Sequence, residues 1–385
     1  MIPSTADILA RLVAEPTVSR ASNLALLDYA EALLRPVGAR IERFAHADGS
    51  RANLWVTIGP DEPGGVVLSG HTDVVPVEGQ EWSHDPFTLT EREGRYYGRG
   101  TADMKGFVAA ALRAALIGAS RPLKIPLHLA LSYDEEIGCI GIRSLITALA
   151  RRPARPALCI VGEPTGMRIA TGHKGKLALR ACCHGQAGHS ALAPNALNAL
   201  HLGAAFINAL QARQEELSIE GARDPDYDIP YSTIHAGMMR GGTALNIVPN
   251  RCEIDFEIRN IAEDDPQEIL ARIKADANAI ASRHRSRFPT ACIEIDEVSA
   301  YPGLSAAPDA PAIRLLRRIL GDGDATLKVA FGTEGGVFNE GLGISTAICG
   351  PGFMDQGHKP DEFVSADQLR QCDRMMARLI DELHA

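Results

Sequence analysis

The sequence predicts a larger α/β domain with a mostly parallel central sheet flanked by helices, interrupted by a smaller α+β domain. Three observations lead to this prediction. The chain has 385 residues, which is more than one ordinary hydrophobic core accommodates. Apolar runs alternate with helical periodicity before residue 177 and again in the tail of the chain. Between these parts the order β-α-β-β-α-β fits a ferredoxin-like sandwich.

The elements of the larger domain are bounded by glycine and proline. A helix capped by Ser4 or Thr5 begins the chain, and a second helical period ends at Pro36 and Gly38. The segments "GGVVLSGH", "KIPLHLALSYDEE" and "ALCIVGEP" are continuous apolar strands, as in a parallel sheet covered on both faces. The segments "MKGFVAAALRAALIGA" and "SLITALARR" between them are helical in period.

The smaller domain has a different pattern. "KLALRACCHGQ" alternates like a half-exposed strand, and a long helix follows it. "YSTIHAGMMRGGTALNIVPNRCEIDFEIR" indicates two strands joined by a glycine-rich turn. Another helix and the strand "ACIEIDEVSA" complete the order. We therefore expect the smaller domain at 177–292 and the larger domain at 1–176 and 293–385.

Composition excludes several classes of function. The net charge is −9 and the pI is near 5.8, which argues against nucleic acid as a partner. There is no apolar run long enough for a transmembrane helix, and the N-terminus lacks the pattern of a secretory signal. The eight cysteines are scattered without a CxxC pair, so we expect free thiols and a cytoplasmic protein with no membrane contact.

Acidic and imidazole side chains follow the ends of the predicted strands. The carboxyl ends of strands in an open α/β sheet form the edge where ligands bind. The residues at these positions are His71, Asp73, Asp103, Asp134, Glu135, Glu136, Glu163 and His358. So many carboxylates in one cleft raise each other's pKa unless cations neutralise them. Imidazole with carboxylate suits Zn²⁺, and this number of ligands suits two ions.

Each of these motifs has an ordinary structural explanation when it is taken alone. "HTD" is a common turn, "DEE" is more often a solvated strand end, and a histidine such as His358 in a loop usually has no special role. The joint pattern, in which each group stands at a strand exit beside glycine or proline, favours a site.

Five blocks resemble the signature of the M20 metallopeptidase family: "SGHTDVVP", "GRGTADMKG", "DEEIG", "GEPT" and "QGHKPDEF". They occur in order between about residues 66 and 363. The resemblance implies a zinc-aminopeptidase-like catalytic, metal-binding domain, interrupted by a lid domain that mediates homodimerisation. It also implies two divalent metal ions, with Zn²⁺ expected first and Co²⁺ or Mn²⁺ as substitutes.

The resemblance assigns a role to each residue of these blocks. His71 and Glu163 bind one metal, Glu136 and His358 bind the other, and Asp103 bridges the two. Asp73 fixes the tautomer of His71. The peptide bond between Asp103 and Met104 is expected to be cis.

The resemblance also indicates the reaction. Glu135 is the general base that takes the proton of a metal-bridging water and delivers it to the leaving amine. His189, in "GQAGHSALAP", resembles a lid histidine that reaches the active site of the partner subunit and stabilises the oxyanion.

Three further blocks concern the substrate, which the family implies to be a small N-acyl amino acid: "ATGHKGKLAL", "GGTALNIVPNRCEIDFEIR" and "FGTEGGVF". "HKG" and the segment "RDPDYDIPYSTIHAG" resemble the acetylornithine deacetylase branch, which serves arginine biosynthesis. Arg259 is expected to clamp an α-carboxylate, with a strand-end salt bridge as the alternative. Glu334 is expected to pair with a cationic side chain such as that of ornithine. The candidate substrate-binding residues are Lys174, Asn246, Arg259, Gly332, Thr333 and Glu334.

Other functions stay open at this point. A broader N-acyl-L-amino-acid amidohydrolase or a succinyl-diaminopimelate desuccinylase would use the same chemistry, and a metal-free binding protein could share the fold. A serine hydrolase is disfavoured because no G-x-S-x-G elbow is present. A nucleotide-binding protein is disfavoured because neither a Walker A loop nor a G-x-G-x-x-G fingerprint occurs.

Overall fold

The computed structural model describes residues 2–321 and 325–385, which divide into two compact units. Unit 2 is Lys174–Gly303, and unit 1 comprises the chain before and after it. The predicted boundaries at 176 and 292 need correction. Strand β14 (Cys292–Tyr301) pairs along its length with β9 (Gly175–His184), so both strands belong to the sheet of unit 2.

Unit 1 is built on a nine-stranded sheet in the order β1-β2-β6-β3-β7-β17-β8-β15, with β16 paired to β8. Its central strands β6, β3, β7 and β17 run parallel to one another, which confirms the predicted parallel centre. The strands are β1 (Arg40–Ala45), β2 (Ala52–Ile58), β3 (Val66–His71), β6 (Leu127–Ser132), β7 (Leu158–Pro164), β8 (Ala170–His173), β15 (Leu304–Ser305), β16 (Leu327–Val329) and β17 (Ser345–Gly350). A separate three-stranded sheet holds β4 (Thr90–Arg92), β5 (Arg95–Tyr97) and β18 (Phe363–Ser365).

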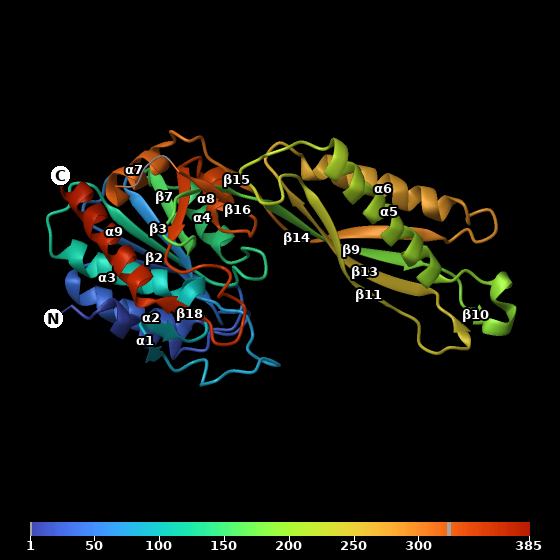
Figure 1. Ribbon diagram of the computed structural model, residues 1–385, viewed down its shortest axis with the longest axis horizontal. Coiled ribbons are helices and arrows are strands. Elements are labelled where there is room, and N and C mark those ends of the chain that lie inside the picture. Colours follow the sequence, from blue (N-terminus) through green and yellow to red (C-terminus); the bar gives the residue numbers. More distant parts are fainter. Residues whose placement is uncertain (1, 322–324) are drawn as a thin grey trace. The chain divides into compact units, whose positions relative to one another are not determined.

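Helices cover this central sheet. They are α1 (Thr5–Val13), α2 (Leu24–Leu34), α3 (Gly106–Ala119), α4 (Ile142–Ala150), α7 (Pro311–Leu320), α8 (Gly335–Leu342) and α9 (Ala366–His384). Helix α3 packs against α1, α2 and α9, while α4 packs against α8 (Figure 1). The Ser4 hydroxyl accepts a hydrogen bond from the amide of Asp7, and the carboxylate of Asp7 accepts one from the Ser4 amide, so Ser4 is the N-cap of α1.

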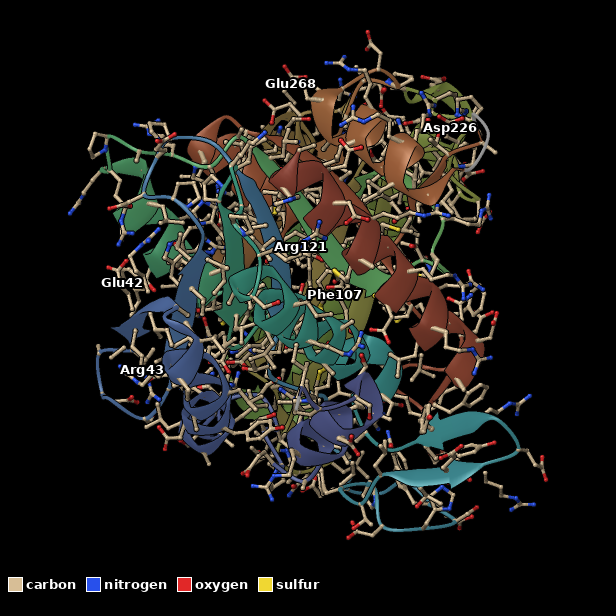
Figure 2. All side chains as sticks on the ribbon, turned by 90° about the vertical axis from the view of Figure 1, so that its left-hand side faces the viewer. Glu42, Arg43, Phe107, Arg121, Asp226 and Glu268 are labelled. Atoms are coloured by element: carbon tan, nitrogen blue, oxygen red, sulfur yellow. The ribbon has the colours of Figure 1, made fainter. Side chains whose placement is uncertain are left out.

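Helix α3 approaches the sheet closely because of one glycine. Phe107 of α3, labelled in Figure 2, lies directly on Gly162 of β7. A Cβ atom at Gly162 would stand 1.9 Å from the ring of Phe107, so no larger residue fits there. Because Glu163 is the next residue of β7, this contact sets how close α3 lies to Glu163.

Unit 2 is an antiparallel sheet with helices on one face. The strand order is β11-β13-β9-β14, and the chain order β-α-β-β-α-β confirms the ferredoxin-like prediction. Besides β9 and β14, its elements are α5 (Ala199–Glu220), β11 (Thr233–Gly241), β13 (Arg251–Asn260), α6 (Pro266–Ser282) and the small pair β10 (Gly188–His189) and β12 (Ile247–Val248). Leu177, Leu179, Ala181 and Cys183 of β9 face the helices, so the alternating residues of β9 lie on the open face.

The structure bears on the predictions about cysteines and about membrane-spanning helices. All eight cysteines are free. Within residues 2–321 and 325–385, every helix is too short or too polar to span a bilayer.

Candidate metal centre

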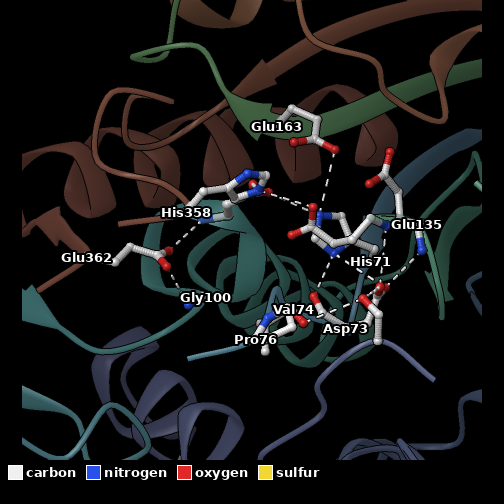
Figure 3. A network of polar contacts seen from close by, with 12 residues as sticks. His71, Asp73, Val74, Pro76, Gly100, Glu135, Glu163, His358 and Glu362 are labelled. Carbon is white, nitrogen blue, oxygen red and sulfur yellow. Dashed lines mark hydrogen bonds and ion pairs between the residues drawn. The ribbon is translucent and has the colours of Figure 1, made fainter. Parts of the chain in front are cut away.

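Three adjacent parallel strands bring predicted ligands to one edge of the unit 1 sheet. His71 is the last residue of β3, and Glu163 lies near the end of the neighbouring β7. Glu135 and Glu136 follow β6 on the other side of β3. Because the carboxyl ends of parallel strands share an edge, these four side chains meet although they are far apart in the sequence. Figure 3 shows His71, Glu135 and Glu163 of this group.

Asp103 stands at the centre of this group. It lies in a π-helical turn (Thr101–Lys105) that leads into α3, and its peptide bond to Met104 is cis, as the family resemblance implies. Its Oδ1 is 3.1 Å from Nε2 of His71, and its Oδ2 is 3.1 Å from Nε2 of His358. The two carboxylate oxygens therefore point in different directions, each toward a histidine.

Each histidine has a second carboxylate beside it. Nε2 of His71 is 3.8 Å from Oε1 of Glu163, and Nε2 of His358 is 3.1 Å from Oε2 of Glu136. The structure thus forms two half-sites that share Asp103. One consists of His71, Asp103 and Glu163, and the other of His358, Asp103 and Glu136.

The electrostatics of the half-sites fit a pair of divalent cations. Burial raises the pKa of Glu136 to about 7 and raises the pKa values of Glu135 and Glu163 well above their usual range. Hydrogen bonds to Asp103 and Glu136 raise the pKa of His358 to about 10, so positive charge is favoured at this position. Oε1 of Glu136 is buried and has no hydrogen-bond partner among the described residues. Zinc prefers imidazole nitrogen and carboxylate oxygen as donors, and a bound cation would offset the cost of burying these carboxylates.

Comparison with known proteins agrees with this geometry. The chain matches the model of "Peptidase family M20/M25/M40" over residues 67–382. The chain belongs to the M20 family. It is 32% identical over 389 residues to an acetylornithine deacetylase of Pasteurella multocida, covering 99% of this chain and 98% of that protein.

Solved structures of M20 proteins share the fold. An M20 family metallo-carboxypeptidase from Sulfolobus solfataricus superimposes with a TM-score of 0.79 at 17% identity, covering 99% of both chains. A Bacillus subtilis protein described as a dinuclear metal binding peptidase of the M20 family has a TM-score of 0.67 at 16% identity, covering 98% of this chain and 96% of that one. Membership of the M20 family makes the chain a hydrolase.

Asp73 of this M20 chain lies beside His71 and also contacts the turn that follows β6. Nδ1 of His71 is 2.8 Å from the main-chain oxygen of Asp73 and 3.6 Å from its carboxylate, with which it forms an ion pair. The carboxylate also accepts hydrogen bonds from the amides of Glu135, at 3.0 Å, and Glu136, at 3.4 Å, and from the hydroxyl of Ser19 at 2.7 Å. The carboxylate of Asp73 therefore contacts both His71 and the turn that carries the two glutamates.

Glu362 is a residue of the site that sequence reasoning missed. Its carboxylate accepts hydrogen bonds from the amides of Gly100 and Ala102, both at 2.9 Å, and of Asp103 at 3.1 Å (Figure 3). Arg99 donates to the same carboxylate at 2.7 Å, and both side chains are 1% exposed. Glu362 thus holds the turn that presents Asp103. It lies inside the block "QGHKPDEF", but no local pattern shows what it contacts.

The surroundings of Glu135 distinguish it from its neighbours. The thiol of Cys139 donates to Oε1 of Glu135 at 3.2 Å, a contact that the sequence did not suggest. Asp134 forms an ion pair with Arg51 and accepts from the amide of Arg20 at 2.6 Å, so it lies outside the two half-sites. Of the three consecutive acids, only Glu135 is both inside the cluster and outside the shared half-sites.

The candidate substrate residues of unit 1 lie on the segment that begins α8. The hydroxyl of Thr333 accepts from the amide of Gly335 at 2.9 Å, so it is occupied by the local turn that follows Gly332. Glu334 is 1% exposed, and its Oε2 accepts from Ser69 at 2.8 Å. Its Oε1 is buried and has no hydrogen-bond partner in the described parts of the chain.

The remaining candidates belong to unit 2, where they form two separate groups. Lys174 donates to the carbonyls of Ile229 and Tyr231, at 2.9 and 2.6 Å. Arg259 contacts Glu257 at 3.0 Å and the hydroxyl of Tyr301 at 2.7 Å.

His189 and Asn246 adjoin the paired strands β10 and β12, and the carbonyl of Asn246 accepts from the amide of Ser190. Arg259 lies at one end of β13, whereas the turn that carries Asn246 adjoins the other end. A ten-residue strand spans roughly 30 Å, so Asn246 and Arg259 of one chain do not form a joint site.

Proposed function

We propose that this M20 protein hydrolyses the N-acetyl amide of N2-acetyl-L-ornithine to L-ornithine and acetate, a reaction of arginine biosynthesis. The observation that carries the proposal of hydrolysis is Asp103, whose two oxygens each face a histidine beside a buried carboxylate. The identity of 32% with an acetylornithine deacetylase over almost the full length of both chains supports the substrate.

Two divalent cations complete the proposed site, with Zn²⁺ favoured by the donors and Co²⁺ or Mn²⁺ able to replace it. His71, Asp103 and Glu163 would hold one ion, and His358, Asp103 and Glu136 would hold the other. When bound, such ions polarise the amide carbonyl and lower the pKa of water toward neutrality.

Glu135 is proposed as the group that moves the proton. Its carboxylate takes a proton from the attacking water while the new carbon–oxygen bond forms at the acetyl carbonyl. It then delivers that proton to the amide nitrogen as the carbon–nitrogen bond breaks, so acetate and the free amine leave. The hydrogen bonds that the Glu135 amide donates to Asp73 and that the Cys139 thiol donates to the Glu135 carboxylate keep this side chain in place.

Two charged side chains are proposed for the recognition of ornithine, each on the chemistry of its own surroundings. The unpartnered, buried Oε1 of Glu334 suits the ammonium group of the ornithine side chain, and Arg259 suits the α-carboxylate. Asn246 and His189 stand at the other end of β13, so we assign them to the active site of a second copy in a homodimer formed through unit 2. Mixing inactive Glu135→Gln and His189→Ala chains should then restore part of the activity, and no rescue would contradict this assignment.

A panel of acylated amino acids tests the substrate. The zinc-loaded protein should show a higher kcat/KM for acetylornithine than for acetylcitrulline, acetylmethionine or succinyl-diaminopimelate. Glu334→Gln should raise KM for acetylornithine more than for acetylmethionine, because only the former has a cationic side chain. Preference for the succinylated substrate, or an equal effect of Glu334→Gln on both acetylated substrates, would overturn the substrate assignment.

A further inference from the structure

Unit 2 has a second cluster of metal-ligating side chains, which the proposed hydrolysis does not use. His184 is the last residue of β9 and Cys292 is the first residue of β14, and the antiparallel register pairs them directly. Glu294 lies two residues further along β14, so its side chain is on the same face of the sheet as that of Cys292. This is the open face, because Cys183 and Ile293 point toward the helices.

The three side chains converge on one point. One ligand atom from each of His184, Cys292 and Glu294 lies within 4.8 Å of the other two. Nε2 of His184 is 3.1 Å from Oε2 of Glu294. The side chains of His184 and Glu294 are 33% and 65% exposed, so the cluster is open to solvent on one side.

The cations near this cluster already have partners. Arg251, which pairs in register with His184, contacts Glu253 at 2.7 Å. Arg285 donates to the carbonyl of Ala291 at 3.1 Å. Neither arginine forms a salt bridge with Glu294 among the described residues, and its carboxylate contacts the ring of His184, which can also act as a neutral ligand.

We propose that His184, Cys292 and Glu294 bind a divalent cation of the zinc class. A thiolate, an imidazole and a carboxylate are donors that Zn²⁺ and Co²⁺ prefer, and two negative charges balance the ion. Binding releases the thiol proton of Cys292 to solvent, and the metal–sulfur bond replaces the sulfur–hydrogen bond. The open side leaves a coordination position for water.

The position of the cluster suggests what the ion would do. Strand β14 is an edge strand of the sheet, whose order is β11-β13-β9-β14. The cluster links the first residues of β14 to the last residue of β9. An ion that binds only the folded sheet stabilises it by mass action. The ion would therefore stabilise the pairing of edge strand β14 with β9, independently of any reaction in unit 1.

Cobalt absorption of the full-length protein tests the proposal. A thiolate bound to Co²⁺ gives a near-ultraviolet sulfur-to-metal charge-transfer band, whereas the half-sites of unit 1 offer only nitrogen and oxygen donors. The wild-type chain titrated with Co²⁺ should show this band, and added Zn²⁺ should remove it. Cys292→Ser should abolish the band and His184→Ala should weaken it, while hydrolytic activity is retained in both.

Cys182→Ser is the matched control, because Cys182 is on the same face of β9 and directly opposite Glu294, but does not belong to the group whose ligand atoms lie within 4.8 Å of one another. It should keep the band. A wild-type protein without the band at saturating Co²⁺, a band that survives in Cys292→Ser, or one that is lost in Cys182→Ser would overturn the proposal. A second measurement uses the wild-type chain alone: Zn²⁺ should slow alkylation of Cys292 by iodoacetamide, and an unchanged rate would equally contradict it.

Discussion

The two units place charged side chains on their sheets in opposite ways. Unit 1 buries acids beside its central sheet: Glu136, which follows β6, and Glu334, at the start of α8, each keep an oxygen without a hydrogen-bond partner among the described residues. Unit 2 keeps its charges on the open face in cross-strand pairs, such as Arg180 with Asp255 at 2.6 Å. A buried carboxylate oxygen without a partner is costly, so its presence indicates a ligand, whereas an exposed pair needs none.

The largest expected effect comes from removing the proton carrier of unit 1. Glu135→Gln should lower kcat by roughly 10²–10⁴-fold, because an amide cannot transfer the proton. Its metal content, measured by atomic emission, should stay at the wild-type level. The adjacent Glu136→Gln is the matched comparison, since it removes a ligand of one half-site and should lower metal content as well as activity. Equal metal loss in both variants would contradict the separation of roles.

The next largest effect is a loss of stability at the buried ion pair of Arg99 and Glu362, which holds the turn that carries Asp103. Glu362→Gln leaves the Arg99 guanidinium without its charged partner in a fully buried place, which typically costs about 3–5 kcal/mol of unfolding free energy. Urea unfolding of the full chain measures this change. Asp361→Asn is the matched control, because Asp361 is partly exposed and contacts only the surface residues Ser83 and His84. A similar loss in both variants would show that Glu362 has no special role.

The ligands of unit 1 could be predicted from sequence, whereas the residues that hold them could not. His71 and Glu163 lie at the ends of apolar strands and Glu136 follows one, and each stands beside glycine or another acid, which is a local signal. Glu362 acts on Gly100, which is 262 residues earlier in the chain, so its role depends on the folded structure. Asp73 lies beside His71, but the sequence does not show that its carboxylate also accepts hydrogen bonds from the amides of Glu135 and Glu136, 62 and 63 residues later in the chain.

The boundary of unit 2 shows a second limit of the sequence. "ACIEIDEVSA" was correctly predicted as a strand, but alternation is the same whichever sheet a strand joins. Only the register with β9 assigns β14 to unit 2.

A third, smaller effect concerns a buried histidine of unit 1 away from the half-sites. Burial lowers the pKa of His128 to about 4, and its ring stacks on Trp55. Between pH 6.5 and about 4 the unfolded chain binds a proton that the folded chain excludes, so stability falls as the pH falls through this window. The contribution is at most about 3 kcal/mol.

Comparing wild type with His128→Gln isolates this effect, because the half-sites titrate equally in both proteins. The variant should lose less stability on acidification, as measured by urea unfolding at a series of pH values. Parallel stability curves for the two proteins across the window would rule out a role for His128.

The smallest effect is expected on the open face of unit 2. Arg180→Ala should leave the midpoint of urea unfolding nearly unchanged, because exposed ion pairs contribute little and salt screens them. A destabilisation comparable to that of Glu362→Gln would mean that the two units do not differ as described here.

Anomalous diffraction from crystals of the zinc-loaded protein tests the proposed metal pair most directly. Two anomalous peaks are expected in unit 1, one between His71 and Asp103 and the other between Asp103 and His358. Unbroken hydrogen bonds between both histidines and Asp103, with no anomalous signal between them, would contradict the metal pair.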